Sequence, residues 1–157
     1  MQTMPILTIP AINQLMEALE DFLDKSEASF AMIIDRGGAV LCEYGNIGTS
    51  TDTSILAALA AGSFAATKEL ALRIGESEFN SLHQEGENSQ IFMCSVDNDA
   101  VLVTIFGPQT TLGLVRFYSA RTVKRICGVL EQIHTNPSMA PIFSPQDIRS
   151  ATRLFDH

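Results

Sequence analysis

The 157-residue sequence contains few cysteines, and none of them is placed to bind a metal ion or to build a disulfide framework. Cys42, Cys94 and Cys127 are odd in number and widely spaced, and no Cys-x-x-Cys motif or Cys/His cluster includes them. The sequence therefore predicts three reduced, mostly buried thiols and no metal site.

Basic residues and long apolar runs are also scarce. The sequence has only 10 Lys and Arg residues but 18 Asp and Glu residues, which gives a formal net charge of −8. Phosphate backbones and anionic lipids repel such a chain, so we do not expect nucleic-acid binding. The longest apolar runs, such as 55–61, are too short to cross a bilayer, and the N-terminus does not resemble a signal peptide. We expect a cytoplasmic protein without membrane insertion.

No motif points to catalysis. The Asp-Arg-Gly-Gly stretch at 35–38 is a turn, and no Gly-Lys-Ser/Thr follows it as in a phosphate-binding loop. His83, His134 and His157 lie in no nucleophile-elbow context, and His83 is expected at the surface of an edge strand. The acidic pairs are typical of solvated helix faces. The sequence thus predicts no catalytic residue, no cofactor and no enzymatic activity of its own.

The apolar spacing does predict a complete α/β (α+β) domain. Helical periodicity covers 9–25, 54–74 and a third segment that begins at Thr110 or Thr111, and strands are expected at 30–34, 39–44, 78–84, 90–96 and 100–106. The dense run 101–106 indicates a central strand buried on both faces. We expect a five-stranded antiparallel sheet with one helix on one face and two on the other.

The C-terminal residues 135–157 are predicted to form a flexible tail after a domain that spans 9–134. Prolines interrupt the segment, and a Ser-Pro-Gln-Asp sequence at 144–147 could start a short amphipathic helix. Four residues of that helix would share an apolar face suited to docking on a partner: Ile148, Ala151, Leu154 and Phe155. The alternative is a disordered terminus.

The second predicted helix is apolar on more than one side. We assign Ile55, Leu59, Ser63, Ala66, Leu70 and Ile74 to its sheet-facing side. The opposite side carries alanines and Leu72 where water alone would favour charge, with Lys68 and Glu69 only near its end. This favours an interface with another protein chain, and the alternative is a run of alanines that serves helix propensity.

Several stretches of this sequence resemble the Roadblock family over residues 9–134. They are IDRGG at 34–38, AGSFAA at 61–66 with IGESEF at 74–79, and VLVTIF at 101–106 followed by TLGLVR at 111–116. The LGLVR and HQEG segments, the latter at 83–86, and the Ile-Phe pair at 142–143 resemble most the MglB-type members, which regulate the bacterial Ras-like GTPase MglA.

The resemblance implies a homodimer, joined through the second helix and the edge strand, that activates an MglA-like small GTPase in bacterial cell polarity and gliding motility. It implies no arginine finger; Arg36 and Arg73 would be the candidates, with Arg73 on or beside the sheet-facing side. It also implies a cytoplasmic protein that can concentrate at a cell pole and bind a polar scaffold protein. The residues that it places at the partner surface are Ala58, Ala61, Ala65, Lys68, Glu69 and Leu72.

Two other functions remain open from the sequence. The same dimer could be an adaptor that binds the GTPase or a polar protein without stimulating hydrolysis. A small-molecule sensor is a further alternative, although no convergent set of polar residues marks a ligand cavity.

Overall fold

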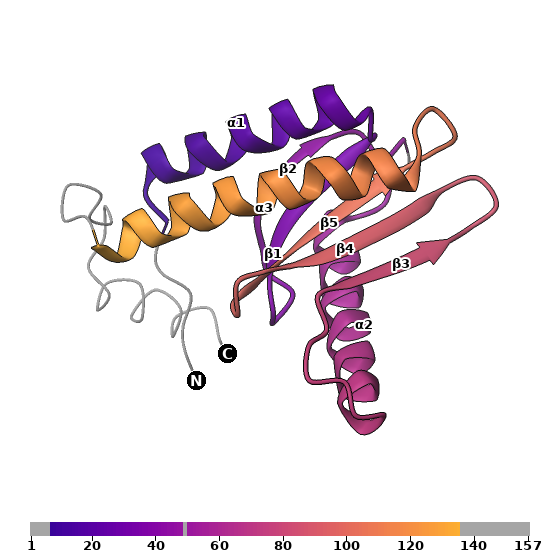
Figure 1. The fold of residues 1–157 in the computed structure, drawn as a ribbon. Coiled ribbons are helices and arrows are strands. Elements are labelled where there is room, and N and C mark those ends of the chain that lie inside the picture. The colour runs from indigo at the N-terminus through magenta and orange to yellow at the C-terminus, as the bar shows by residue number, and fades with distance from the viewer. Residues whose placement is uncertain (1–6, 49, 136–157) are drawn as a thin grey trace, which may run out of the picture.

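The fold is known from a computed structural model, which describes residues 7–48 and 50–135. The elements follow the predicted order of helix, two strands, helix, three strands and helix (Figure 1). They are α1 (Ile9–Ser26), β1 (Phe30–Asp35), β2 (Val40–Gly45), α2 (Thr53–Arg73), β3 (Ser81–Glu85), β4 (Gln90–Val96), β5 (Ala100–Phe106) and α3 (Leu112–Thr135).

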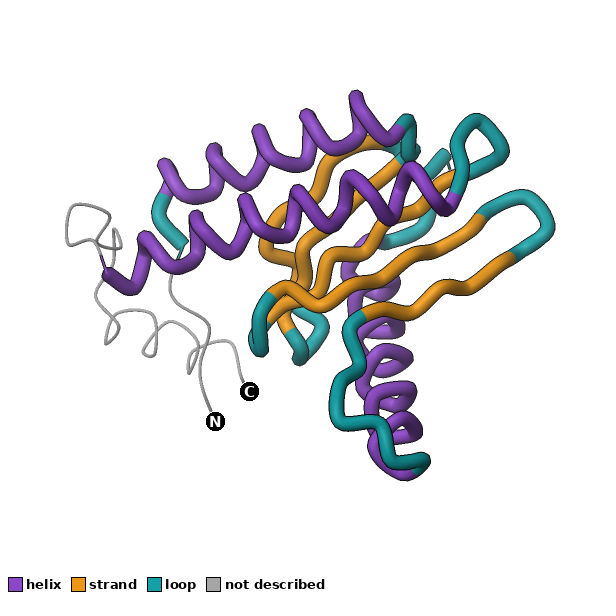
Figure 2. Tube along the Cα trace, viewed as in Figure 1, coloured by secondary structure: helices purple, strands orange, loops and turns teal. Residues whose placement is uncertain are grey.

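The five strands form one antiparallel sheet in the order β2-β1-β5-β4-β3. Strand β5 lies in the middle, and all its residues except Ile105 are buried, which confirms the central strand expected from its dense apolar run. Strand β3 is an edge strand, as predicted, but it begins at Ser81 rather than at residue 78. Figure 2 shows α1 and α3 on one face of the sheet and α2 on the other, which confirms the predicted layers.

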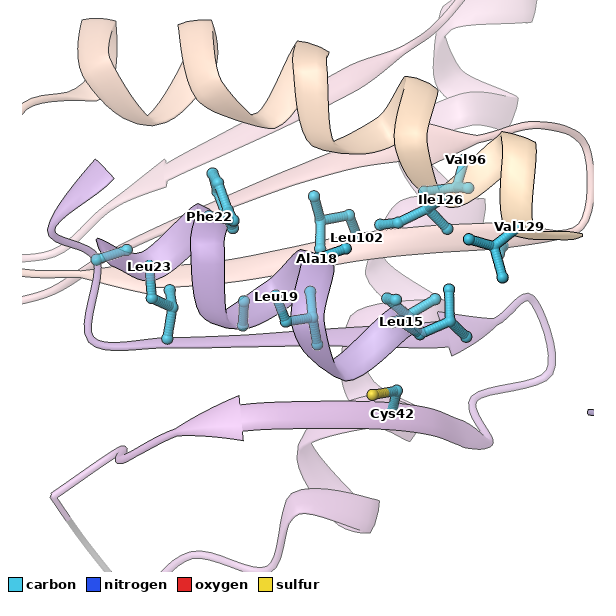
Figure 3. Close-up of a cluster of buried hydrophobic side chains, with 14 of the residues drawn as sticks. Leu15, Ala18, Leu19, Phe22, Leu23, Cys42, Val96, Leu102, Ile126 and Val129 are labelled. Atoms are coloured by element: carbon cyan, nitrogen blue, oxygen red, sulfur yellow. The ribbon is translucent and has the colours of Figure 1, made fainter. Parts of the chain in front are cut away.

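The core consists of two clusters, one on each face of the sheet. The larger cluster packs α1 and α3 onto the sheet through residues such as Leu15, Phe22 and Ile126 (Figure 3). In the smaller cluster, α2 packs against β1, β4 and β5 through Ala57, Ala60, Ala61 and Phe64. Helix α2 is therefore held by one short stretch of its length.

Side-chain caps fix where the helices begin. The Asp52 carboxylate accepts a hydrogen bond from the backbone N–H of Ser54 at 2.9 Å, and Thr111 Oγ1 accepts one from Leu114 at 3.2 Å. Both satisfy amides that the first turn of a helix leaves unpaired. These caps confirm the predicted starts of α2 and α3. Gly75, at φ +93°, follows the end of α2, where the left-handed conformation favours glycine.

The predicted sheet-facing side of α2 is wrong. Leu59, Leu70 and Ile74 are exposed. The helix packs on the sheet through Ala57, Ala60, Ala61 and Phe64, while Ala58 and Ala65 are exposed. Because α2 is apolar on nearly every side, spacing alone could not identify its buried face. Packing selects the alanines, since small side chains let the helix backbone approach the hairpin turn at Gly38.

Gly38→Ala is expected to destabilise the fold by about 2 kcal/mol, because two separate obstacles oppose a side chain there. The residue has φ +94°, and an added Cβ would lie 2.8 Å from the Cα of Ala58. Thermal unfolding should show a Tm lower by roughly 5 °C or more. The control is Gly37→Ala in the same turn, where the nearest atom is the Asp35 carboxylate at 3.4 Å. Equal Tm values for the two variants would contradict this account.

Candidate protein-binding surface on helix α2

Helix α2 exposes an unusual amount of apolar surface. Among the described helices, α2 alone has the length and the apolar composition needed to span a bilayer. Only 22% of the 18-residue stretch that meets this test is buried in the fold. This corrects the expectation that every apolar run is too short for a membrane, although one such helix is weak support for a membrane span. Figure 1 shows the C-terminal half of α2 extending beyond the sheet. Exposed apolar surface of this kind marks an interaction site.

One side of α2 borders a hollow of about 320 Å³, which we call the Arg36 groove. Five of the six predicted partner-binding residues line it, and only Ala58, which is also exposed on α2, does not. The groove joins an apolar floor to charged groups at its rim. Its lining consists of Arg36, Ala61, Phe64, Ala65, Lys68, Glu69, Leu72 and Val101.

The opposite side of α2 borders a second, more apolar hollow of about 270 Å³, which we call the Leu59 groove. It opens between α2 and the strands β3, β4 and β5, so it adjoins the sheet edge that β3 leaves unpaired among the described strands. The side-chain amide of Gln84 donates to Ser63 Oγ across it at 3.1 Å. The lining consists of Leu56, Leu59, Ala60, Ser63, Gln84, Ile91, Met93 and Val103.

Sequence reasoning missed the Leu59 groove because it placed Leu59 and Ser63 against the sheet. The available signal was the helix itself: a segment that is apolar all round must present apolar residues outward whichever face is buried. The two grooves give α2 two separate candidate surfaces for binding, one adjoining the β3 edge and one on the other side of the helix.

Arg36 is held in place by the end of β4 and by the turn between β4 and β5. Its guanidinium donates to Ser95 Oγ at 3.1 Å, to the Asp97 carbonyl oxygen at 3.3 Å and to the Asn98 carbonyl oxygen. The same cation lies 5.9 Å from the centre of the Phe64 ring. Arg36 therefore forms a fixed wall of its groove.

Arg73, unlike Arg36, is not held by another part of the described fold and lies at the exposed end of α2. Its side chain is 78% exposed and pairs with Glu69 at 2.9 Å. Exposed pairs of this type contribute little to stability, about 0–1 kcal/mol. The expectation that Arg73 lies on or beside the sheet-facing side is wrong, because that side of α2 is formed by the alanines.

The remaining candidate groups have structural roles. His83 is half-buried on β3, where its Nε2 lies 2.7 Å from Gln90 Oε1 and its ring stacks over Phe106. The three cysteines are free; Cys42 is buried and the other two are half-buried. Burial raises the pKa of Cys42 to about 11 and that of Cys94 to about 12, so both thiols stay protonated near neutral pH. The described residues contain no group of three or more potential metal ligands.

The predicted docking residues of the tail, Ile148, Ala151, Leu154 and Phe155, lie outside the described residues. The candidate surface therefore consists of the two grooves beside α2.

Comparison with known proteins connects this surface with a family. The Roadblock/LC7 domain model matches residues 15–106, which is more than half of the chain. No curated protein matches. Among solved structures, the gliding protein MglB from Thermus thermophilus is 28% identical, with a TM-score of 0.75 over 84% of this chain and 99% of that one.

Two further MglB structures are similar over most of the chain. MglB from Myxococcus xanthus is 30% identical, with a TM-score of 0.73 over 78% of this chain and 91% of that one. An MglB with a tetrameric arrangement is 27% identical, with a TM-score of 0.77 over 85% of this chain and 99% of that one. The fold, the matched residues and these similarities together show that the chain belongs to the Roadblock/LC7 domain family, where it is similar to MglB.

Proposed function

We propose that the chain is a homodimeric regulator that stimulates GTP hydrolysis by a small Ras-like GTPase of the MglA type. The observation that carries the proposal is the Arg36 groove, because it gathers five predicted partner-binding residues beside an exposed apolar helix. A chain with this surface activates a partner by contact and needs no active site of its own. The proposal includes a cytoplasmic role in cell polarity and motility, with concentration at a cell pole and a polar scaffold protein as a further partner.

The two grooves suggest how α2 divides its surface between partners. The Leu59 groove adjoins the β3 edge, so a second copy could cover its apolar lining and extend the sheet through β3 at the same time. This leaves the Arg36 groove for the GTPase. Its mixed apolar and charged lining is typical of a specific interface whose partner also exists free in solution.

Stimulation in this proposal comes from positioning. GTP hydrolysis depends mainly on the arrangement of the nucleophile and on stabilisation of charge, so a surface that holds the switch loops of the GTPase can accelerate it. Arg36 is already engaged by three acceptors, one on β4 and two in the β4–β5 turn, which argues against its use as an arginine finger.

A GTPase assay tests the proposal. Purified GTPase loaded with GTP should hydrolyse it faster when the regulator is added in excess, and the rate should saturate with regulator concentration. Binding without any rise in hydrolysis would overturn the activating role and establish the adaptor alternative. Absence of binding would reject both.

Arg73→Ala should leave stimulation of hydrolysis within about twofold of wild type, because the surface pair with Glu69 contributes little. A true arginine finger contributes on the order of 10³-fold or more to the rate, so the two outcomes are well separated. The measurement is the saturating single-turnover rate, and Arg73→Lys is the control that keeps the charge. A large loss in Arg73→Ala would show that Arg73 acts on the nucleotide.

A further inference from the structure

The layer of α1 and α3, on the sheet face opposite α2, contains a hollow that the proposed function does not use. It has a volume of about 320 Å³, near the lower end of ligand sites, which run from about 300 to 1,000 Å³. Figure 1 shows the two helices side by side along the sheet. We call this hollow the α1/α3 crevice, and its polar lining includes Asp21, Lys25, Tyr118, Arg121 and Arg125.

The crevice is basic on a protein that is acidic overall. Three cations and one carboxylate of those residues leave an excess of two positive charges, whereas the whole chain has a net charge of −8. Helix α3 carries this charge: the stretch 112–130 contains four Arg and Lys and no acidic residue. A concentrated basic row on an acidic protein attracts an anionic partner to one place.

The two arginines of the crevice are available to a ligand, whereas Lys25 pairs with Asp21 at 3.0 Å. Arg125 lies 3.7 Å from Asp21 and 3.8 Å from Glu17, at the long end of ion pairing and with partly exposed side chains. Such surface pairs contribute only about 0–1 kcal/mol, so a ligand carboxylate can replace them. Within the described residues Arg121 makes no ion pair, and its guanidinium lies 5.5 Å from the Phe117 ring.

Apolar side chains extend the crevice along the outer face of α3. Phe117 is 55% exposed and Leu114 is 42% exposed. Residues 114, 117, 121 and 125 follow one another at helical spacing, so they form one row along α3. Phe117 also packs edge-on against Tyr118 at 5.1 Å, which holds its ring at the rim.

We propose that the α1/α3 crevice is a docking site for an acidic protein segment that also carries an aromatic or aliphatic residue. Carboxylates of the segment pair with Arg121 and Arg125, and its apolar residue packs on Leu114 and Phe117. The chain's own tail does not fit this chemistry, because in 136–157 Asp147 and Asp156 are balanced by Arg149 and Arg153.

An anionic membrane fits less well than a protein segment. Helix α1 places Glu17, Glu20, Asp21 and Asp24 beside the basic row, and all of these except Asp21 are exposed. A flat anionic bilayer would meet both rows and be repelled by one of them. A single peptide segment can follow the basic row alone.

A displayed library of random peptides, selected on the full-length protein, tests the proposal. Enriched peptides should have net negative charge and at least one aromatic or aliphatic residue. Their affinity, measured by fluorescence anisotropy, should fall about tenfold or more in Arg121→Glu/Arg125→Glu, and should weaken with added salt. Arg121→Gln/Arg125→Gln should give a smaller loss and provides a second test if the charge reversal fails to fold.

The control is Arg73→Glu, a charge reversal at an exposed arginine of α2, which lies outside the crevice and on the other face of the sheet. It should retain the affinity for the selected peptides. Enriched peptides without acidic residues, or a loss of affinity in Arg73→Glu equal to that in Arg121→Glu/Arg125→Glu, would overturn the proposal. Tighter binding to vesicles of equimolar phosphatidylcholine and phosphatidylserine than to any selected peptide would overturn it in favour of a membrane surface.

Discussion

Ala65→Arg is expected to abolish stimulation of the GTPase while leaving the fold intact. Ala65 is exposed, and it lines the Arg36 groove between Lys68 and Ala61. A long cation there fills the groove and adds like charge beside Arg36 and Lys68. The stimulated hydrolysis rate at fixed regulator concentration should fall at least about tenfold, which corresponds to ~1.4 kcal/mol of lost contact energy.

The matched control for this prediction is Ala120→Arg, which introduces the same side chain at an exposed alanine of α3 on the other sheet face. Both variants should keep the wild-type circular dichroism spectrum and Tm, and Ala120→Arg should also keep full stimulation. If Ala65→Arg stimulates hydrolysis like wild type, the Arg36 groove is not the GTPase site. Ala61→Arg is unsuitable for the test, because Ala61 is buried against the sheet and an unpaired charge there would unfold the domain.

Leu59→Glu is expected to convert the proposed dimer into monomers. Leu59 is 69% exposed in the single chain and lies in the apolar groove beside the β3 edge, where a second copy is proposed to pack. Two buried carboxylates, one from each copy, would then face an apolar surface without partners. The loss should be about 2 kcal/mol or more, roughly a 30-fold rise in the dimer dissociation constant.

Sedimentation velocity over a range of protein concentrations measures this change directly. Leu114→Glu is the control, since Leu114 is an exposed leucine on α3, remote from α2. The control should sediment as wild type does. An unchanged dimer in Leu59→Glu would show that self-association uses another surface, and the division of α2 between its two sides would have to be abandoned.

The strands and the layer arrangement could be predicted because their signals are local. The run at 101–106 leaves little choice but a strand buried on both faces, and glycine at the hairpin turn fixes where β1 and β2 reverse. Asp52 and Thr111 mark helix starts through contacts within three residues of themselves. Each of these features is decided by neighbours in sequence.

The orientation of α2 and the shape of its grooves depend on residues far apart in the chain. Leucine and isoleucine look better suited to a core than alanine, but the close approach of Gly38 to Ala58 leaves room only for small side chains. The Arg36 groove requires a turn residue that precedes α2 and is itself held by the turn at 97–98. Spacing within one helix contains no information about either contact.

The short stretch of α2 that packs on the sheet has a thermodynamic consequence. Its four buried residues lie between Ala57 and Phe64, while the last turns, with Leu70 and Leu72, lie in water. In a single chain these turns are stabilised by their own hydrogen bonds and by the exposed Arg73–Glu69 pair, and a neighbouring molecule is needed to shield their apolar surface. Association with a neighbouring molecule therefore increases the fraction of chains in which the helix end is ordered. This fraction, and with it the complete lining of the Arg36 groove, rises with protein concentration by mass action. The proposed regulator then has its complete binding surface only where its local concentration is high.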